Sequence, residues 1–178
     1  MSKNDKLFAI VDIETTGGFA RGNAITEIAI ILHDGKNIVD EYVTLINPGQ
    51  FIPLKIQQLT GITNEMVADS PYFDEVADAI YSKLKGNIFV AHNVNFDFSF
   101  VHNQLSYFGF DFNPPKLCTV ILSRKIFLGK PSYSLGKLCQ NLKIDNYARH
   151  RAYGDALATA KLFTLLVEND NNQLINNL

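Results

Sequence analysis

The sequence predicts a mixed α/β fold, in which a single sheet carries helices on its faces. Three strand-like segments follow one another near the N-terminus, and helical and strand-like segments then alternate along the rest of the chain. At 178 residues, of which 47% are hydrophobic, the chain is long enough for a domain that buries about 70% of its unfolded surface. We therefore expect one domain that spans residues 1–178.

Apolar runs of strand length lie at 6–13, 25–33 and 37–46. A glycine-rich connection separates the first two runs, and Asp34-Gly35 between the second and third is a strong hairpin signal. Consecutive strands joined in this way form a β-meander, which we expect Pro48-Gly49 to end. One more short buried strand is predicted at 88–93, IFVAHN.

The remaining segments are predicted to be helices, at 54–62, 74–86, from Phe96 to the Pro114-Pro115 break, 119–128, 133–142 and 152–168. The segment 74–86 illustrates the pattern, because apolar side chains recur on one side of a helical turn and Gly86 follows as a stop signal. The polar, Asn-rich tail after residue 168 is expected either to fray or to lead into a further domain.

Composition narrows the functional classes. No apolar run approaches 18 residues, and the first residues lead straight into a strand, so we expect neither a membrane span nor a signal peptide. Cys118 and Cys139 are far apart, without a Cys-x-x-Cys pair, which favours free buried thiols and a cytoplasmic location.

The net charge of −2 argues against a broad basic surface of the kind that grips duplex DNA. If cations neutralised four of the acids, however, the rest of the chain would be positively charged. Basic side chains could then line a short groove, and the candidates are Arg124, Lys125, Lys130, Arg149 and Arg151.

Two acids one residue apart, Asp12 and Glu14, lie at the end of the first strand, in FAIVDIETTGG. Alternate residues of a strand share a face, so these two side chains project together. Neighbouring carboxylates repel each other unless a proton or a cation lies between them, and oxygen-only clusters suit Mg²⁺ or Mn²⁺. Taken alone, such a pair more often marks a solvated strand end, so the rest of the chain decides between the two interpretations.

Further candidates lie along the chain. Asp97 falls at the first turn of a helix, where the helix dipole alone also favours an acid. His150 and Asp155 would be about 140° apart on one continuous helix, so we place His150 on a loop and Asp155 in the opening turn of the last helix. From a mobile loop His150 could fold back over the acids. A lone loop histidine is usually solvated, and we assign His33 and His102 to that class.

Together these segments resemble the DEDDh family of 3′→5′ exonucleases, which is named for four acids and a histidine. DIETTG (12–17) is similar to the first motif of that family, HNVNFD (92–97) to the second, and HRAYGDALAT (150–159) to the third. LTGIT (59–63), CTVILSRKIF (118–127) and the segment 135–144 resemble the proofreading epsilon subunit of bacterial DNA polymerase III. The resemblance covers a core of about residues 6–168 and implies a ribonuclease H-like α/β fold, with a mixed five-stranded sheet flanked by helices.

The resemblance also implies a reaction and a set of ligands. Two divalent ions, Mg²⁺ or Mn²⁺, about 3.5–4 Å apart would activate a water molecule and stabilise the leaving 3′ oxygen. Asp12 would bridge both ions, Glu14 and Asp155 would complete the set of direct ligands, and Asp97 would hold the second ion directly or through water. His150 would be the general base, a role that suits imidazole because its ordinary pKa is about 6.5.

Contacts with the strand end are implied too, from Thr15, Thr16, Gly17, Ile62, His92, Asn93 and Phe96. The threonines would offer hydroxyl and backbone N–H groups to the terminal 3′-OH, and Ile62 and Phe96 would stack against terminal bases. Phe96 taken alone fits core packing equally well. His92 and Asn93 either contact the penultimate phosphate or order the second motif.

The function implied is release of nucleoside 5′-monophosphates from DNA 3′ ends, in proofreading or repair. An exoribonuclease acting on short RNA or RNA tails is the alternative, because contacts to the 2′-OH decide between them and no residue settles these. A catalytically silent nucleic-acid-binding module is a second alternative, which predicts the loss of a metal ligand or of the base. The partners implied are a single-stranded DNA 3′ end, or RNA, and a DNA polymerase subunit or a covalently linked second nuclease domain, but no membrane.

Overall fold

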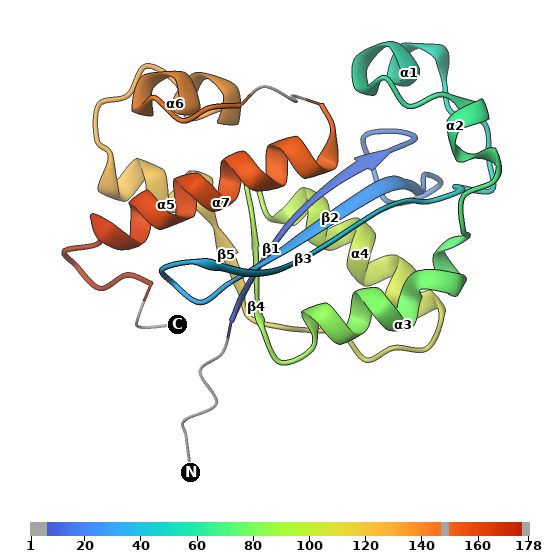
Figure 1. Ribbon diagram of the computed structural model, residues 1–178, viewed down its shortest axis with the longest axis horizontal. Helices are drawn as coiled ribbons and strands as arrows, with labels where there is room; N and C mark the ends of the chain where they lie inside the picture. The colour runs from blue at the N-terminus through green and yellow to red at the C-terminus, as the bar shows by residue number, and fades with distance from the viewer. Residues whose placement is uncertain (1–6, 147–149, 176–178) are drawn as a thin grey trace.

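The computed structural model describes residues 7–146 and 150–175, and it confirms the mixed α/β prediction. Five strands form one sheet in the order β3-β2-β1-β4-β5, with β1 in the centre (Figure 1). The strands are β1 (Phe8–Thr15), β2 (Ile25–His33), β3 (Ile38–Leu45), β4 (Ile88–Ala91) and β5 (Lys116–Cys118).

The first three strands form the predicted meander. β1 pairs antiparallel with β2 along its length, and β2 pairs antiparallel with β3. The hairpin between β2 and β3 closes where it was predicted, because the Asp34 carboxylate accepts hydrogen bonds of 2.7 Å from the backbone N–H groups of Lys36 and Asn37. On the other side of β1 the strands β4 and β5 add in parallel.

Helices cover both faces of this sheet. They are α1 (Leu54–Thr60), α2 (Asn64–Ala68), α3 (Phe73–Leu84), α4 (Asn95–Tyr107), α5 (Thr119–Ile126), α6 (Leu135–Leu142) and α7 (Ala152–Glu168). α3 and α4 lie on one face, and α5 and α7 lie on the other with α6 against α7 (Figure 1). The sequence did not predict α2 or β5, because elements of five and three residues are too short to show a period.

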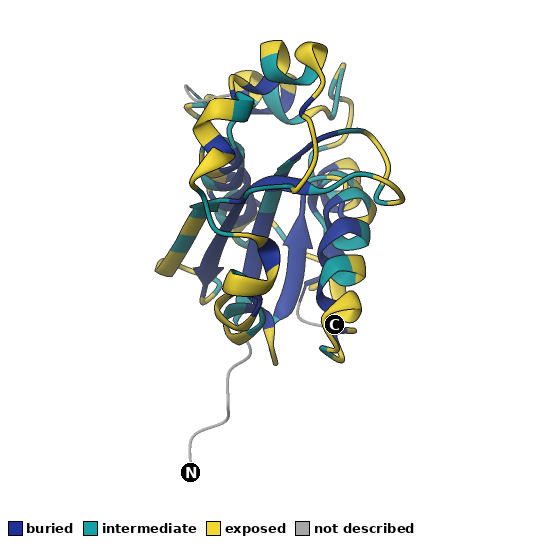
Figure 2. Ribbon diagram, turned by 90° about the vertical axis from the view of Figure 1, so that its right-hand side faces the viewer, coloured by how far each residue is buried: buried dark blue, intermediate teal, exposed yellow. Residues whose placement is uncertain are grey.

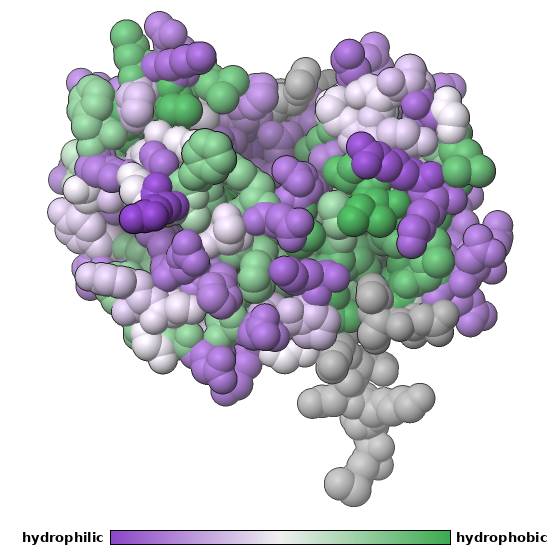
Figure 3. Space-filling view, turned by 180° about the vertical axis from the view of Figure 1, so that it is seen from behind, coloured by the Kyte–Doolittle hydropathy of each residue, from purple (hydrophilic) through white to green (hydrophobic). Residues whose placement is uncertain are grey.

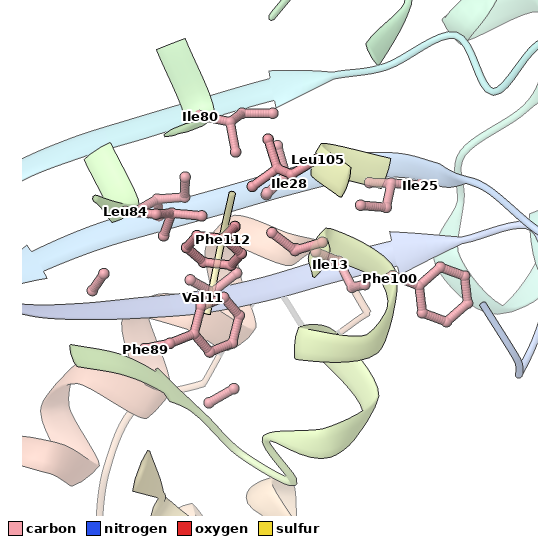
Figure 4. Packing of buried hydrophobic residues seen from close by; sticks show 14 of the residues in the cluster. Val11, Ile13, Ile25, Ile28, Ile80, Leu84, Phe89, Phe100, Leu105 and Phe112 are labelled. Atoms are coloured by element: carbon pink, nitrogen blue, oxygen red, sulfur yellow. The ribbon is translucent and has the colours of Figure 1, made fainter. Parts of the chain in front are cut away.

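Strand alternation sends the side chains of β1 into two separate cores. Ala9, Val11 and Ile13 pack beneath α3 and α4, together with Phe89 and Phe100 (Figure 4). The even-numbered Ile10 instead packs against α7 on the opposite face. Each fully buried side chain of this size contributes about 1.5–3 kcal/mol to folding. β2 and β4 are accordingly buried along their whole length, whereas the edge strand β3 and the outward faces of the helices are largely exposed (Figure 2).

This division places Asp12 and Glu14. Both are even-numbered residues of β1, so their side chains lie on the same face as Ile10, which is the face that α7 covers. Across from the start of α7, a short arm made of α1 and α2 has its own small core of Ile52, Ile62 and Val67. The end of the sheet toward which β1 points is therefore flanked by this arm and by the start of α7 (Figure 1).

One histidine assignment is wrong. His33, expected to be solvated, is buried at the end of β2, where Nε2 lies 3.0 Å from the Thr164 hydroxyl and Nδ1 accepts a hydrogen bond from the Gly35 N–H. Burial lowers its pKa, since the charged imidazolium would lose its hydration. His102 is half-buried with its ring 5.3 Å from the ring of Phe98. Along the described ranges, no helix has the length and apolar character that a membrane span requires.

Candidate active site

The acidic pair lies where β1 outgrows its parallel neighbour. The pairing of β1 with β4 runs only from Phe8 to Ile10, whereas β1 continues to Thr15 along β2. Asp12 and Glu14 belong to this overhanging stretch and are both partly buried. A strand that extends past its neighbour leaves an open edge, and a side chain from another element can enter there.

Asp97 and Asp155 reach the pair from opposite faces of the sheet. Asp97 lies in the first turn of α4, as predicted, and is only 4% exposed. The left-handed turn at Asn93, with φ of 76°, reverses the chain after β4 and so brings α4 to this position. Asp155 lies in the first turn of α7, also as predicted.

Three of these acids form a tight cluster. Asp12, Glu14 and Asp155 each offer a carboxylate oxygen, and the three oxygens lie within 4.8 Å of one another. Asp97 is not a member of this group, but its charge is one of those that raise the pKa of Asp12. The structure thus brings residues 143 positions apart in the sequence into one group of ligand atoms that could hold a metal ion.

Without a metal ion, ionising all the carboxylates of this cluster is energetically unfavourable. Burial and the neighbouring carboxylates raise the pKa of Asp12 well above its ordinary value. Burial, with Asp155 and Glu27 nearby, raises the pKa of Glu14 to about 7, against a lowering by Arg151. Burial also raises the pKa of Asp97 to about 8, although backbone N–H groups, including that of Ile13, favour its ionised form.

A divalent cation fits this donor set. The ligands are all oxygen atoms of carboxylates, which hard ions such as Mg²⁺ and Mn²⁺ prefer. Burial and the neighbouring carboxylates raise the pKa values of Asp12 and Glu14, and a bound cation would offset this excess of negative charge.

His150 lies directly beside the cluster. It precedes α7 on an exposed stretch, as predicted, and its backbone has the left-handed φ of 60°. Its backbone N–H donates a hydrogen bond of 2.9 Å to Oδ2 of Asp155. The other oxygen, Oδ1, accepts a bond of 3.2 Å from the amide of Asn146. Asp155 is therefore oriented by both sides of the segment that carries His150.

Glu27 is a further acidic residue of this region that sequence reasoning missed. It is only 3% exposed, lies directly opposite Glu14 in the β1–β2 register and forms an ion pair with Arg151. The signal was available, since Glu27 is the one charged residue in the otherwise largely apolar run ITEIAIILH. A charge inside a fully buried strand needs a partner, and this points to a specific contact.

The two threonines after Glu14 are held by internal bonds. The Thr15 hydroxyl donates to the Gly17 carbonyl at 2.8 Å. The Thr16 hydroxyl accepts from the Ala24 N–H at 3.0 Å and from the Gln50 amide at 2.5 Å, and the Thr16 N–H donates to the Ala24 carbonyl. Thr16 is 2% exposed. In this arrangement both threonines shape the turn after β1, and their contact with a substrate stays a prediction.

The other residues predicted to touch substrate have mostly internal partners. Ile62 is fully buried inside the core of the α1–α2 arm, and Phe96 is half-buried against Phe100, 5.2 Å between ring centres. His92 links two elements, with Nδ1 2.9 Å from the Thr119 hydroxyl and Nε2 2.9 Å from the Tyr133 carbonyl oxygen. Of the two roles left open for His92, this geometry favours ordering the second motif. Burial lowers its pKa.

Of the basic residues named from the sequence, Arg124 and Lys125 are exposed and Arg151 has an acidic partner. Arg151 is engaged with Glu27, and the Arg124 guanidinium lies 5.8 Å from the centre of the Tyr133 ring. Arg149 lies outside the described residues. Figure 3 nevertheless shows a hollow lined by hydrophilic residues at one end of the molecule, between two projecting lobes.

Comparison with known proteins gives this cluster its context. The RNase_T exonuclease family model matches residues 9–163, which is most of the chain and contains all four acids and His150. The chain belongs to this exonuclease family. The expectations of an exonuclease, and thus of a hydrolase, are confirmed by this membership.

Similarity to individual proteins agrees with membership of this exonuclease family. The chain is 36% identical over 165 residues to DNA polymerase III subunit epsilon of Aquifex aeolicus, and the match covers 92% of this chain and 82% of that protein. It is 38% identical over 167 residues to the 3′-5′ exonuclease DinG of Bacillus subtilis, where it covers 93% of this chain but 18% of the larger protein.

Solved structures confirm the expected ribonuclease H-like fold. Exonuclease X in complex with 5′ overhanging duplex DNA superimposes on this exonuclease with a TM-score of 0.75 at 28% sequence identity, over 92% of each chain. The mixed five-stranded sheet and its flanking helices are therefore shared with a solved exonuclease.

Proposed function

We propose that this protein is a divalent-metal-dependent 3′→5′ exonuclease that removes nucleoside 5′-monophosphates from the 3′ end of DNA. One observation carries the proposal: Asp12, Glu14 and Asp155 bring their carboxylate oxygens within 4.8 Å of one another. Asp97, from a second segment, lies close enough for its charge to raise the pKa of Asp12, and the backbone N–H of His150 donates to Asp155. We infer that these five residues, which come from three segments of the sequence, form the site of a metal-dependent nuclease.

The chain's own residues have distinct roles in this reaction. Asp12, Glu14 and Asp155 would hold the divalent ion, and Asp97 would hold a second one directly or through water. Mg²⁺ or Mn²⁺ bound there supplies a Lewis acid that activates water and stabilises the leaving oxygen. His150 would accept the proton of the attacking water, and the bond from its backbone N–H to Asp155 ties this residue to the cluster. Asp155 is held by two N–H donors, and one of its oxygens lies within 4.8 Å of the oxygens of Asp12 and Glu14.

We propose DNA as the substrate because of what the similar proteins are named and hold. Two of the similar proteins are named as a DNA polymerase subunit and a 3′-5′ exonuclease, and the solved Exonuclease X holds duplex DNA with an overhang. We propose a single-stranded 3′ end as the substrate, and either a polymerase subunit or a linked catalytic domain as the partner. A single exonuclease domain over residues 1–178 and a cytoplasmic location are parts of the same proposal.

The decisive experiment is a product ladder. A 5′-labelled single-stranded DNA oligomer, incubated with Mg²⁺ or Mn²⁺, should shorten one nucleotide at a time from its 3′ end, and nucleoside 5′-monophosphates should accumulate. A matched RNA oligomer in a parallel reaction should be degraded much more slowly. Excess EDTA should stop both reactions.

Three outcomes would contradict the proposal. Digestion that survives EDTA would exclude the metal-dependent chemistry. Rapid trimming of the RNA oligomer with negligible cleavage of the DNA would reverse the substrate assignment. Binding of both oligomers without any product would leave a nucleic-acid-binding module, and the Asp12→Asn variant serves as the inactive reference for that comparison.

A further inference from the structure

Glu27 is a buried charge placed beside a cluster of like charges. All nine residues of β2 are buried, and Glu27 is the only acid among them. It lies opposite Glu14 in the antiparallel register, so both carboxylates point to the α7 face of the sheet. Its charge contributes to the raised pKa values of Asp12 and Glu14. A carboxylate that only aggravated this repulsion would weaken the fold, so its partners are informative.

Both oxygens of Glu27 are bound by the beginning of α7. Nη2 of Arg151 donates to Oε1 at 2.6 Å, and Nε of the same guanidinium donates to Oε2 at 3.0 Å. The backbone N–H of Ala152, the first residue of α7, donates to Oε2 at 2.8 Å. A two-pronged guanidinium contact fixes direction as well as distance, and the third bond places the carboxylate at the helix N-terminus.

This attachment bears on the direction of Asp155, in the first turn of α7, and of His150, just before it. Each residue of a helix turns by about 100°, so a small rotation of the first turn would swing Asp155 away from Asp12 and Glu14. The first turn is linked internally, because the Asp155 N–H donates to the Arg151 carbonyl at 3.1 Å and the His150 N–H donates to the Asp155 carboxylate at 2.9 Å. A shift of Arg151 would therefore move both Asp155 and His150.

We propose that Glu27 and Arg151 are positioning residues of the active site, which anchor the first turn of α7 so that Asp155 and His150 lie against the acids of β1. The proposal rests on the exonuclease function proposed above. Neither residue is assigned to contact substrate.

The test separates anchoring from simple support of the fold. Arg151→Lys keeps the positive charge but loses the guanidinium fork, and Glu27→Gln removes the charge but keeps an acceptor for the Ala152 N–H. Tyr153→Phe is the matched control. The Tyr153 hydroxyl, in the same turn of α7, donates a hydrogen bond of 3.0 Å to the Glu41 carboxylate on β3, so this variant also removes a bond between α7 and the sheet. Each full-length variant is checked by circular dichroism and then assayed for Mn²⁺ affinity by calorimetry and for kcat and KM on a DNA oligomer.

For both anchor variants we expect folded protein whose Mn²⁺ affinity and kcat fall by about 10- to 100-fold, as is typical when a residue that orients a metal ligand is removed. KM for the oligomer should stay unchanged, because Glu27 is buried and Arg151 is bound to it. Tyr153→Phe should match the wild type in all three quantities. A role confined to stability would lower the melting temperature of the anchor variants and leave kcat and Mn²⁺ affinity of the folded fraction intact.

Wild-type values of kcat and Mn²⁺ affinity in folded Arg151→Lys and Glu27→Gln would overturn the anchoring. If Glu27→Gln does not fold, Arg151→Lys decides alone, since the Arg151 side chain is 40% exposed and lies at the rim. A wild-type protein that binds Mn²⁺ but degrades no oligomer would defeat the proposed exonuclease function, and the Mn²⁺ affinities of the variants would still decide the anchoring.

Discussion

Replacing Glu14 by glutamine should stabilise the metal-free protein at alkaline pH while it abolishes metal-dependent activity. The pKa of Glu14 is raised from 4.5 to about 7 by burial and by the charges of Asp155 and Glu27. The folded state therefore retains a proton between these two pH values that the unfolded state releases. The stability associated with this proton is fully present below pH 4.5 and is lost as the pH rises through 7.

The size of the effect follows from the same two values. The difference between 4.5 and about 7, at 1.36 kcal/mol for each pH unit, corresponds to about 3 kcal/mol. Glu14 is partly exposed, so solvent screening reduces the expected gain of Glu14→Gln to about 2 kcal/mol at pH 8.5. At pH 5 the folded wild type is protonated at this position, and the two proteins should have nearly equal stability.

Urea unfolding in EDTA at pH 5 and pH 8.5 measures this difference. Glu168→Gln, an exposed change at the far end of α7, is the control and should show no such pH dependence. Saturating Mn²⁺ should then stabilise the wild type much more than Glu14→Gln, because the variant lacks one of the oxygens of the cluster. Equal free energies of unfolding for wild type and Glu14→Gln at both pH values in EDTA would refute the electrostatic reasoning.

Three further substitutions test the roles assigned above. His150→Ala should lower kcat on a DNA oligomer by about 10²–10⁴-fold with little change in binding, and near-normal turnover would remove it from the mechanism. His92→Ala should lower the free energy of unfolding by about 1–3 kcal/mol in urea, because a buried hydroxyl and the Tyr133 carbonyl lose their partner; an unchanged midpoint would contradict this. Gly17→Ala should reduce both stability and kcat, because a Cβ there overlaps the Asn23 side chain that bonds to Thr16, and wild-type thermal unfolding and turnover would show that the turn adapts.

Much of the fold could be predicted because its signals are local. The strand Ile25–His33 was placed at its observed bounds, and the β2–β3 hairpin at Asp34-Gly35, since apolar runs and turn residues reveal themselves over a few positions. β5 was missed because three residues, Lys116–Cys118, form a strand only through pairing with β4. The burial of His33 was missed for a similar reason, because α7 supplies Thr164 from far along the chain.

The candidate site likewise has features that could be predicted from the sequence and features that could not. Strand alternation was enough to pair Asp12 with Glu14, and motif similarity was enough to select Asp97, His150 and Asp155. Neither showed that the Thr16 hydroxyl is taken up by internal bonds or that Ile62 is enclosed in a separate small core. These outcomes depend on which side chain fills a given space after packing, and no spacing along the chain encodes that.

The sequence by itself was enough to predict the chemistry proposed for this protein, because carboxylates, an imidazole and their motif spacing can be read from the residue types alone. Only the tertiary structure decided that Glu27 binds the first turn of α7, through a guanidinium 124 positions away. The physical reason is that a buried charge must find its partner in three dimensions. Which cation lies within reach depends on how the sheet and the helix pack against each other.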